Sequence, residues 1–347
     1  MTLRRAAFAV PGDITTPTGG YIYERRLLDG LRAQGRDLRH LELGGSFPDP
    51  TEQDMGDAIA QLQALEPDRA VILDGFVSAT LDTGALAGLH VPAVAMVHHP
   101  LAFETGLPAA RRDHLFEIER RNLAHIAHVL VPSPSTAALL VRAYDVRPDR
   151  ITIARPGTIQ PSRPPAPTDP PLILSVGIQH PRKGHDILLQ ALGRITDLDW
   201  SAVIAGKAYD AAHAAELGEL LDRLDLHGRV ALRGFVPDRD LAGHYGAASI
   251  FALATRFEGY GLVFDEALAH GLPIVSCRTG AVPDTVPPEA GLLVAPDDPG
   301  ALADALSYLL THPDQRARLA EAAGAWGRRL PGWSETAQIA GQVLDRI

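Results

Sequence analysis

The chain has 347 residues, of which 46% are hydrophobic and 21% are charged, which suits two domains with buried cores and excludes a disordered chain. Its 42 acidic and 32 basic residues give a formal net charge of −10, which argues against a nucleic-acid partner because phosphate binding needs a basic surface. The one cysteine, Cys277, excludes an internal disulfide and a cysteine-based metal cluster.

The sequence shows neither a membrane-spanning helix nor a secretory signal. No apolar run approaches the roughly 18–20 residues that a membrane helix needs. The first apolar run, Ala6–Val10, follows a basic pair but is shorter than the hydrophobic part of a signal peptide, about 7–15 residues. We therefore expect a cytoplasmic protein.

Short apolar runs alternate with helical patterns along the first half of the chain. Strands that are apolar almost throughout are typical of parallel sheets covered on both faces. The predicted strands are Ala6–Pro11, Leu38–Leu43, Ala70–Asp74, Ala93–His98, His128–Pro132 and Ile151–Arg155. The predicted helices are Gly20–Gln34, Glu52–Leu65, Ala109–Ala127 and Pro134–Tyr144.

A proline-rich segment separates the two halves. Arg155–Pro171 holds 7 of the 28 prolines within 17 residues, a density that fits neither a helix nor a central strand and predicts a stiff linker. The alternation then resumes. The predicted strands of the second half are Ile173–Val176, Ala202–Ala205, Val230–Leu232, Ile250–Ala254, Ile274–Cys277 and Gly291–Val294. The predicted helices are Asp186–Ile195, Ala211–Leu224, Asp238–Ala247, Val263–His270, Gly300–Thr311 and Gln315–Leu330.

This rhythm predicts an α/β fold with two doubly wound, Rossmann-like domains that face each other across a central cleft. In such sheets the carboxyl ends of the strands line the ligand site. The segment after one late strand, Phe257–Gly271, contains a Gly-Tyr-Gly turn that opens a helix. Glycines there allow close approach of a ligand, and the first amides of the helix favour an anion such as a diphosphate. Glu258 and Glu266 bracket this turn and suit hydroxyl groups of a sugar.

The segment resembles the signature of the retaining, nucleotide-sugar-dependent glycosyltransferases of family 4, also called group 1, which have the GT-B fold. Two glutamates separated by seven residues, within a Phe-Glu-Gly-aromatic-Gly-Leu context, carry the resemblance. It extends over almost the whole chain through Gly19-Gly20, Ile153–Gly157, Ser175–Gly177 with Pro181–Gly184, Gly234–Pro237 and Ala281–Asp284.

The resemblance implies that the two domains bind different substrates. Residues 1–160 would form the acceptor-side domain, 161–171 the linker and 172–330 the domain that binds the nucleotide-sugar. A C-terminal helix in 331–347 would cross back and pack on the N-terminal domain. The donor would be a UDP- or GDP-sugar, and the acceptor a glycolipid, a polysaccharide precursor or a small metabolite.

The resemblance also implies roles for residues of the second domain. Arg182 and Lys183 would neutralise the leaving diphosphate in place of a metal, and Glu258 would contact hydroxyls of the donor sugar. Glu266 would hold the ribose, and the backbone near Val236 would meet the base. The other donor-binding residues implied are Gly177, Gly259, Tyr260, Gly261 and Leu262. Two positions depart from the family pattern: Ile178 stands where many members have arginine, and Val263 stands where proline is frequent.

In the first domain, His98 matches the histidine near the reacting centre of the family. Gly19 and Gly20 would let the loop before them approach the donor. Three further residues are expected to line the acceptor side: Tyr21, Arg25 and Glu104.

We expect no cofactor and no metal, because no set of histidine and carboxylate residues has metal-ligand spacing. Basic pairs such as Arg25-Arg26 and Arg111-Arg112 are typical of solvated helix faces, with peripheral contact to anionic lipid at the inner face of the membrane as the alternative. The protein is expected to be a monomer or a homodimer. Three other functions fit less well: a retaining glycoside hydrolase that uses both glutamates, a dinucleotide oxidoreductase, for which the third glycine is missing, and a two-domain sugar-binding protein without catalysis.

Overall fold

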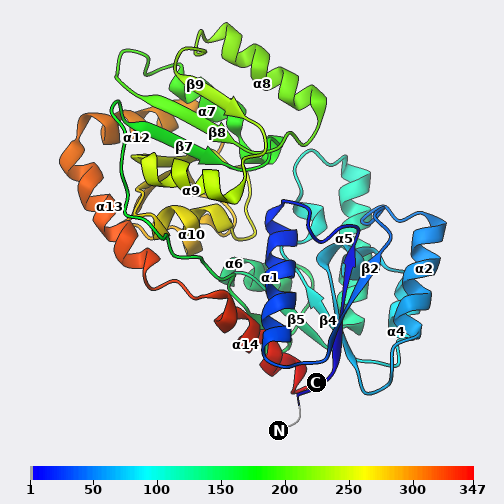
Figure 1. Cartoon of the computed structure of the whole chain (residues 1–347). Helices are drawn as coiled ribbons and strands as arrows, with labels where there is room; N and C mark the ends of the chain where they lie inside the picture. The colour runs from blue at the N-terminus through cyan, green and yellow to red at the C-terminus, as the bar shows by residue number, and fades with distance from the viewer. Residues whose placement is uncertain (1–2) are drawn as a thin grey trace. The chain divides into compact units, whose positions relative to one another are not determined.

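The computed structural model describes residues 3–347, which form two compact units (Figure 1). The first unit contains the chain up to Gly157 together with Pro331–Ile347, and the second is Thr158–Leu330. The predicted α/β fold with two doubly wound parallel sheets is confirmed. No helix within residues 3–347 is long and apolar enough to cross a membrane.

The first unit is built on a six-stranded parallel sheet with the order β2-β1-β3-β4-β5-β6. Its strands are β1 (Ala6–Pro11), β2 (Leu38–Leu43), β3 (Ala70–Leu73), β4 (Ala93–Met96), β5 (His128–Val131) and β6 (Ile151–Ile153). Its helices are α1 (Gly19–Ala33), α2 (Glu52–Gln63), α3 (Gly75–Thr80), α4 (Thr83–Ala87), α5 (Ala109–His125), α6 (Pro134–Ala143) and α14 (Trp333–Leu344).

Side chains that alternate along the strands of this sheet form two separate cores. Ala7 and Ala9 of β1 belong to the core under α2 and α5, whereas Ala6, Phe8 and Val10 belong to the core under α1 and α14. Successive residues of a strand point to opposite faces, so a sheet covered on both sides needs apolar residues at every position. This explains the continuous apolar runs in the sequence.

The second unit contains another six-stranded parallel sheet, with the order β12-β11-β10-β7-β8-β9. Its strands are β7 (Leu172–Val176), β8 (Ser201–Ala205), β9 (Val230–Arg233), β10 (Ile250–Leu253), β11 (Ile274–Cys277) and β12 (Gly291–Val294). Its helices are α7 (His185–Leu192), α8 (Ala211–Arg223), α9 (Asp238–Ala247), α10 (Leu262–Ala269), α11 (Val282–Thr285), α12 (Pro299–Thr311) and α13 (Pro313–Gly327). Cys277 is buried in the core under α7 and α12.

The last helix, α14, belongs to the first unit and packs along α1, as Figure 1 shows at the red end of the chain. A Cβ atom on Gly30 of α1 would lie 2.6 Å from the Cβ atom of Ala337, so glycine allows the two helices to approach closely. The guanidinium of Arg36, whose side chain is fully buried, donates to the Asp345 carboxylate at 2.8 and 3.0 Å.

The proline-rich segment forms no helix or strand between Ala154 and Pro171. The boundary between the units falls at Gly157, before most of the prolines. Within the second unit, the amides of Ala166 and Thr168 donate to carbonyl groups of Gly246 and Ala247 at the end of α9. Most of the prolines therefore lie along the second unit, in a segment without helix or strand.

Candidate active site

Each sheet has one place where the strand order reverses. This place lies between β1 and β3 in the first unit and between β7 and β10 in the second. Open α/β sheets bind ligands outside the carboxyl ends of the strands at this switch point. The residues predicted from the sequence follow these strands: Gly19 and Gly20 come after β1, Arg182 and Lys183 after β7, and Glu258 after β10.

In the second unit the structure brings Lys183, Arg182 and Glu258 together. Lys183 Nζ lies 2.6 Å from Glu258 Oε1, and Arg182 Nη1 lies 3.4 Å from Glu258 Oε2. Arg182 also donates to the carbonyl of Phe257 at 2.9 Å, and the Thr255 hydroxyl donates to Glu258 Oε1 at 3.1 Å. Both cations are thus held in place before any substrate binds.

The electrostatics of Glu258 follow from these contacts. The residue is 4% exposed, and burial alone would raise the pKa of its carboxyl. The nearby ammonium of Lys183 and guanidinium of Arg182 outweigh burial, so the pKa lies below its usual value. Two cations share one carboxylate, and the group as a whole carries a net positive charge.

Gly261 begins the helix that was predicted to receive the diphosphate. Its φ is +89°, and a Cβ atom there would lie 2.6 Å from the ring of Phe264, so both the backbone and the space require glycine. The helix starts at Leu262, four residues after Glu258, and the amide groups of its first turn have no acceptor at position i−4 within the helix. Tyr260 is buried, and its hydroxyl donates to the Asp265 carboxylate.

Glu266 lies one turn into α10, and Tyr245 of α9 donates a hydrogen bond of 2.7 Å to its Oε2 atom. Burial raises the pKa of Glu266 to about 7, against the effect of this hydrogen bond. Among the described residues the other carboxylate oxygen has no hydrogen-bond partner. Its predicted role in holding a ribose remains a prediction.

Three further donor-side residues lie in the segments that follow β7, β9 and β10. Gly177 directly follows β7, and a Cβ atom there would touch the side chain of Lys183 at 3.3 Å. Val236 follows β9 and packs partly buried against the core under α9 and α10. Gly259 lies between Glu258 and Tyr260 in the loop that precedes α10. Donor contacts of these residues stay predictions.

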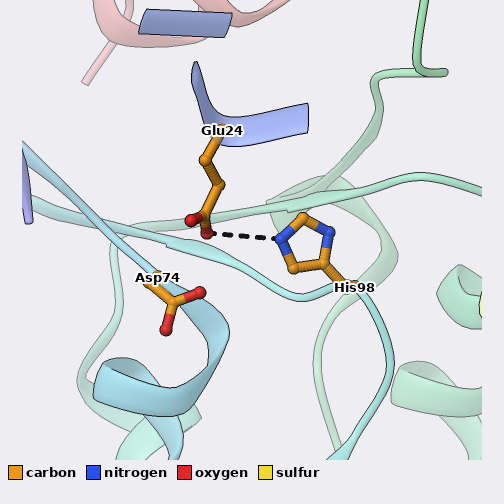
Figure 2. Close-up of side chains that lie close together, drawn as sticks. All are labelled: Glu24, Asp74 and His98. Carbon is orange, nitrogen blue, oxygen red and sulfur yellow. Dashed lines mark hydrogen bonds and ion pairs between the residues drawn. The ribbon is translucent and has the colours of Figure 1, made fainter. Parts of the chain in front are cut away.

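At the switch point of the first unit, His98 meets two buried carboxyl groups (Figure 2). Its Nε2 atom lies 3.3 Å from Oε1 of Glu24, which comes from α1. Asp74 follows β3, and its Oδ1 atom accepts from the amide of Phe76 at 2.8 Å. A Cβ atom on Gly20 would lie 3.5 Å from the His98 ring, so the predicted glycine and histidine are neighbours.

Burial controls the protonation of this group. It raises the pKa of Glu24 to about 7, and together with the charge of Glu24 it raises the pKa of Asp74 well above its usual value. Burial lowers the pKa of His98. Within the described part of the chain, this is the only set of three residues whose ligand atoms, all within 4.8 Å of one another, could hold a metal ion. The expectation that the protein needs no metal stays a prediction.

The three residues expected on the acceptor side support loops of the first unit. The Tyr21 hydroxyl donates to the Pro11 carbonyl at 2.7 Å, and Arg25 donates to the Ile14 carbonyl at 3.2 Å, so both hold the loop after β1. Glu104 accepts from the amide of Thr105 at 3.0 Å and lies 3.3 Å from His99 Nε2.

Glu24 and Asp74 were not predicted as site residues from the sequence. Glu24 lies on the buried side of α1 with Tyr23 and Leu27, and a carboxylate within an apolar helical stripe is the signal that could have identified it. Asp74 gave a weaker signal, because an aspartate before a short helix is an ordinary N-cap.

Two family profiles match the chain. The group 1 glycosyl transferases match residues 158–326, and glycosyltransferase family 4 matches residues 51–158. The chain therefore belongs to the group 1, family 4 glycosyltransferases.

Curated relatives agree with this family. The D-inositol 3-phosphate glycosyltransferase of Xylanimonas cellulosilytica is 35% identical over 57% of this chain and 52% of the relative. That of Frankia alni is 33% identical over 63% of this chain and 59% of the relative. The chain thus spans little more than half the length of the curated relatives it matches.

Solved structures show the same fold. Sucrose-phosphate synthase from Thermosynechococcus elongatus has a TM-score of 0.84 at 22% identity, with 98% of both chains covered. Anabaena HepE, solved in complex with UDP and glucose, has a TM-score of 0.78 at 16% identity and is covered completely, as is this chain. The fold of this chain is GT-B.

Proposed function

We propose that the protein is a retaining glycosyltransferase that moves a hexose from a UDP- or GDP-sugar to a hydroxyl acceptor without a metal ion. One observation carries the proposal: Lys183 and Arg182 are fixed on Glu258 at the switch point of the second sheet. A leaving diphosphate concentrates negative charge on its oxygens, and two ordered cations beside a helix N-terminus suit that charge.

In the proposed reaction, the acceptor hydroxyl attacks the anomeric carbon from the face that the diphosphate leaves. The bond from the anomeric carbon to the phosphate oxygen breaks, the bond to the acceptor oxygen forms, and the acceptor proton passes to the departing phosphate. Lys183 and Arg182 stabilise the diphosphate, Glu258 contacts the sugar hydroxyls, and Glu266 binds the ribose. His98 is proposed to contact the transferred sugar.

Family membership and the complex of HepE with UDP and glucose support a nucleotide-sugar donor. The names of the curated relatives give inositol 3-phosphate as their acceptor, but this acceptor is not carried over to the present chain. We propose a cytoplasmic, peripheral setting with a carbohydrate, lipid or small-molecule acceptor.

A thermal-shift panel tests the donor. The purified protein is melted with UDP, GDP, ADP, their sugar conjugates and NADH, each with and without EDTA. A ligand at 100 times its dissociation constant stabilises the folded state by about 2.7 kcal/mol. We expect a rise in Tm with one nucleotide and its sugar, unchanged by EDTA. A shift with NADH alone, or with free sugars and not with nucleotides, would refute the proposal.

A further inference from the structure

We propose that Arg256 is a positioning residue for the transfer reaction: its guanidinium holds the turn that carries Arg182 and Lys183, and so fixes both cations for the leaving diphosphate. The inference rests on the proposed function, since it concerns the two cations assigned to the diphosphate there. Arg256 comes after β10, two positions before Glu258, and the turn Pro181–Lys183 comes after β7. The two segments are neighbours because β7 and β10 are paired in the sheet.

The segment after β10 holds the backbone of the turn. The Arg182 carbonyl accepts from the amide of Arg256 at 2.8 Å, and the Thr255 hydroxyl lies 3.1 Å from the same oxygen. The Pro181 carbonyl accepts from Nη1 of Arg256. A single 3₁₀ turn makes few hydrogen bonds of its own. Bonds to two successive carbonyl groups therefore fix the direction in which the side chains of this turn leave the backbone.

Two carboxylates hold the guanidinium of Arg256 in turn. Its Nη1 and Nη2 atoms lie 3.0 and 2.8 Å from the two carboxylate oxygens of Asp186, which is in the first turn of α7. Its Nε atom lies 2.7 Å from Oδ1 of Asp297. A planar guanidinium that makes two parallel bonds to one carboxylate is fixed in orientation as well as in position.

The charge of Arg256 is neutralised within the protein. Burial would raise the pKa of Asp186, but the hydrogen bonds and charge of Arg256, together with two backbone amides, hold this pKa below its usual value. Asp186 and Asp297 thus place two carboxylates on one guanidinium. Lys183 and Arg182, in contrast, share one carboxylate. We therefore assign Arg256 to the support of the turn and not to direct contact with the diphosphate.

The two cations of the turn need this support. Lys183 Nζ and Arg182 Nη1 lie 2.6 and 3.4 Å from the same carboxylate, that of Glu258, so their like charges are held close together. Stabilisation of developing charge requires groups that are in place beforehand, and a displacement of about 1 Å can cost about 100-fold in rate.

Binding of a nucleoside diphosphate tests the inference without an acceptor. The diphosphate released in the reaction carries the charge that the two cations are proposed to meet, whereas the corresponding monophosphate lacks the terminal phosphate. Affinities for both are measured by calorimetry with the full chain, with the base identified in the thermal-shift panel. The ratio of the two affinities is internal to each variant, so partial loss of folded protein does not affect it.

Two variants remove the support in different ways. Arg256→Lys keeps the charge but not the planar fork, and we expect the ratio of diphosphate to monophosphate affinity to fall by about 10-fold, as for lost hydrogen bonds to a charged group. Asp186→Asn keeps the guanidinium but weakens its support, and the ratio is expected to fall by about 3-fold.

Two comparisons separate positioning from general stability. Arg229→Lys is the matched control, because Arg229 also donates to backbone carbonyl groups, those of Leu198 and Trp200, but precedes β9 and so lies at the other end of the sheet. This variant should keep the wild-type ratio. In a Lys183→Ala background, Arg256→Lys should lower the ratio by less than about 3-fold, because one of the groups that it positions is absent.

Three results would overturn the inference. A wild-type ratio in Arg256→Lys would show that the fork is not needed. An equal fall with and without Lys183 would show that Arg256 does not act through that residue. An equal fall in Arg229→Lys would show a general effect of stability. In each case binding of the nucleotide still stands, whereas a wild-type protein that binds no nucleoside diphosphate would mean that the proposed function itself has failed.

Discussion

Lys183 lies in the turn after β7 and Glu266 lies one turn into α10, and the two residues are proposed to act at different stages. The ammonium of Lys183 is fixed by Glu258, so it is ready to meet negative charge that develops as the diphosphate leaves. The Glu266 carboxylate is bound by Tyr245 and has an oxygen available for a hydroxyl of the bound donor. Loss of Lys183 should therefore affect turnover, and loss of Glu266 should affect donor binding.

Steady-state kinetics of two variants separate these roles. Lys183→Ala is expected to lower kcat by about 100-fold with little change in the donor KM, as for loss of one group that stabilises a transition state. Glu266→Ala is expected to raise the donor KM by about 10-fold, as for a lost hydrogen bond to a charged group. Arg223→Ala, on the exposed face of α8, is the control. Unchanged kinetics in both variants would contradict the assignments.

A substitution at Gly261 tests whether the turn before α10 requires a residue without a side chain. Gly261→Ala places a Cβ atom against Phe264 at a positive φ and is expected to destabilise the protein by about 1–3 kcal/mol in urea unfolding. Gly218→Ala is the matched control: this glycine lies within α8 with open space around it, so alanine should stabilise by about 0.5–1 kcal/mol. Equal effects of both substitutions would show that the turn is not strained by a side chain.

The donor-side residues could be proposed from the sequence because Glu258 and Glu266 lie close together along the chain within one motif. The acidic pair of the first unit could not, because Glu24 and Asp74 are 50 positions apart in the sequence and only the folded sheet brings them together. Pairing across the sheet depends on strand order, which spacing along the chain does not reveal.

At the level of elements, α14 shows how a terminal segment completes a core. It buries Ala337, Ala340 and Leu344 against α1 on one face of the first sheet. The pair of Arg36 and Asp345 ties its last turn to the end of α1. Since the Arg36 side chain is fully buried, loss of its carboxylate partner would leave an unpaired charge in the core.

Asp345→Asn is accordingly expected to destabilise the first unit by about 1–3 kcal/mol at pH 7, less than for a fully buried pair because the carboxylate is partly solvated. Arg36 lowers the pKa of Asp345, so the pair stabilises the folded state above the usual aspartate value of 3.8 and loses its effect as pH falls below it. The variant and wild type should converge in acid. Asp113→Asn, which breaks an exposed pair, should cost less than about 0.5 kcal/mol.

The strands were predictable because burial on two faces makes them apolar throughout, and the long helices because burial on one face gives their apolar residues a helical period. The short helices α3 and α4 were not, because five or six residues give no period to detect. Each begins at an aspartate, Asp74 or Asp82, whose carboxylate accepts from a backbone amide. Their N-caps are visible in the sequence only once a helix is known to follow.

For the whole molecule, three buried carboxyl groups each make a contribution to stability that falls as pH rises. Burial raises the pKa of Glu119 to about 8, and those of Glu24 and Glu266 to about 7. Between the unfolded value near 4.5 and these higher values the folded state binds more protons, so its stability declines with pH and then levels off.

Glu119→Gln isolates one contribution, because this carboxyl group lies on α5 and not at either switch point. The difference in unfolding free energy between pH 5 and pH 8 should shrink by roughly 1–3 kcal/mol relative to wild type. Urea unfolding at the two values measures it. A difference that stays the same or grows would mean that Glu119 is ionised in the folded protein.

The most direct measurement is proton NMR of the sugar transferred from an α-linked UDP- or GDP-sugar. We predict that the nucleotide diphosphate is released with EDTA present and that the new glycosidic bond is α. A β-linked product would contradict retention, and a requirement for added metal would contradict the role of Lys183 and Arg182. Failure to consume any nucleotide-sugar would contradict the proposed activity as a whole.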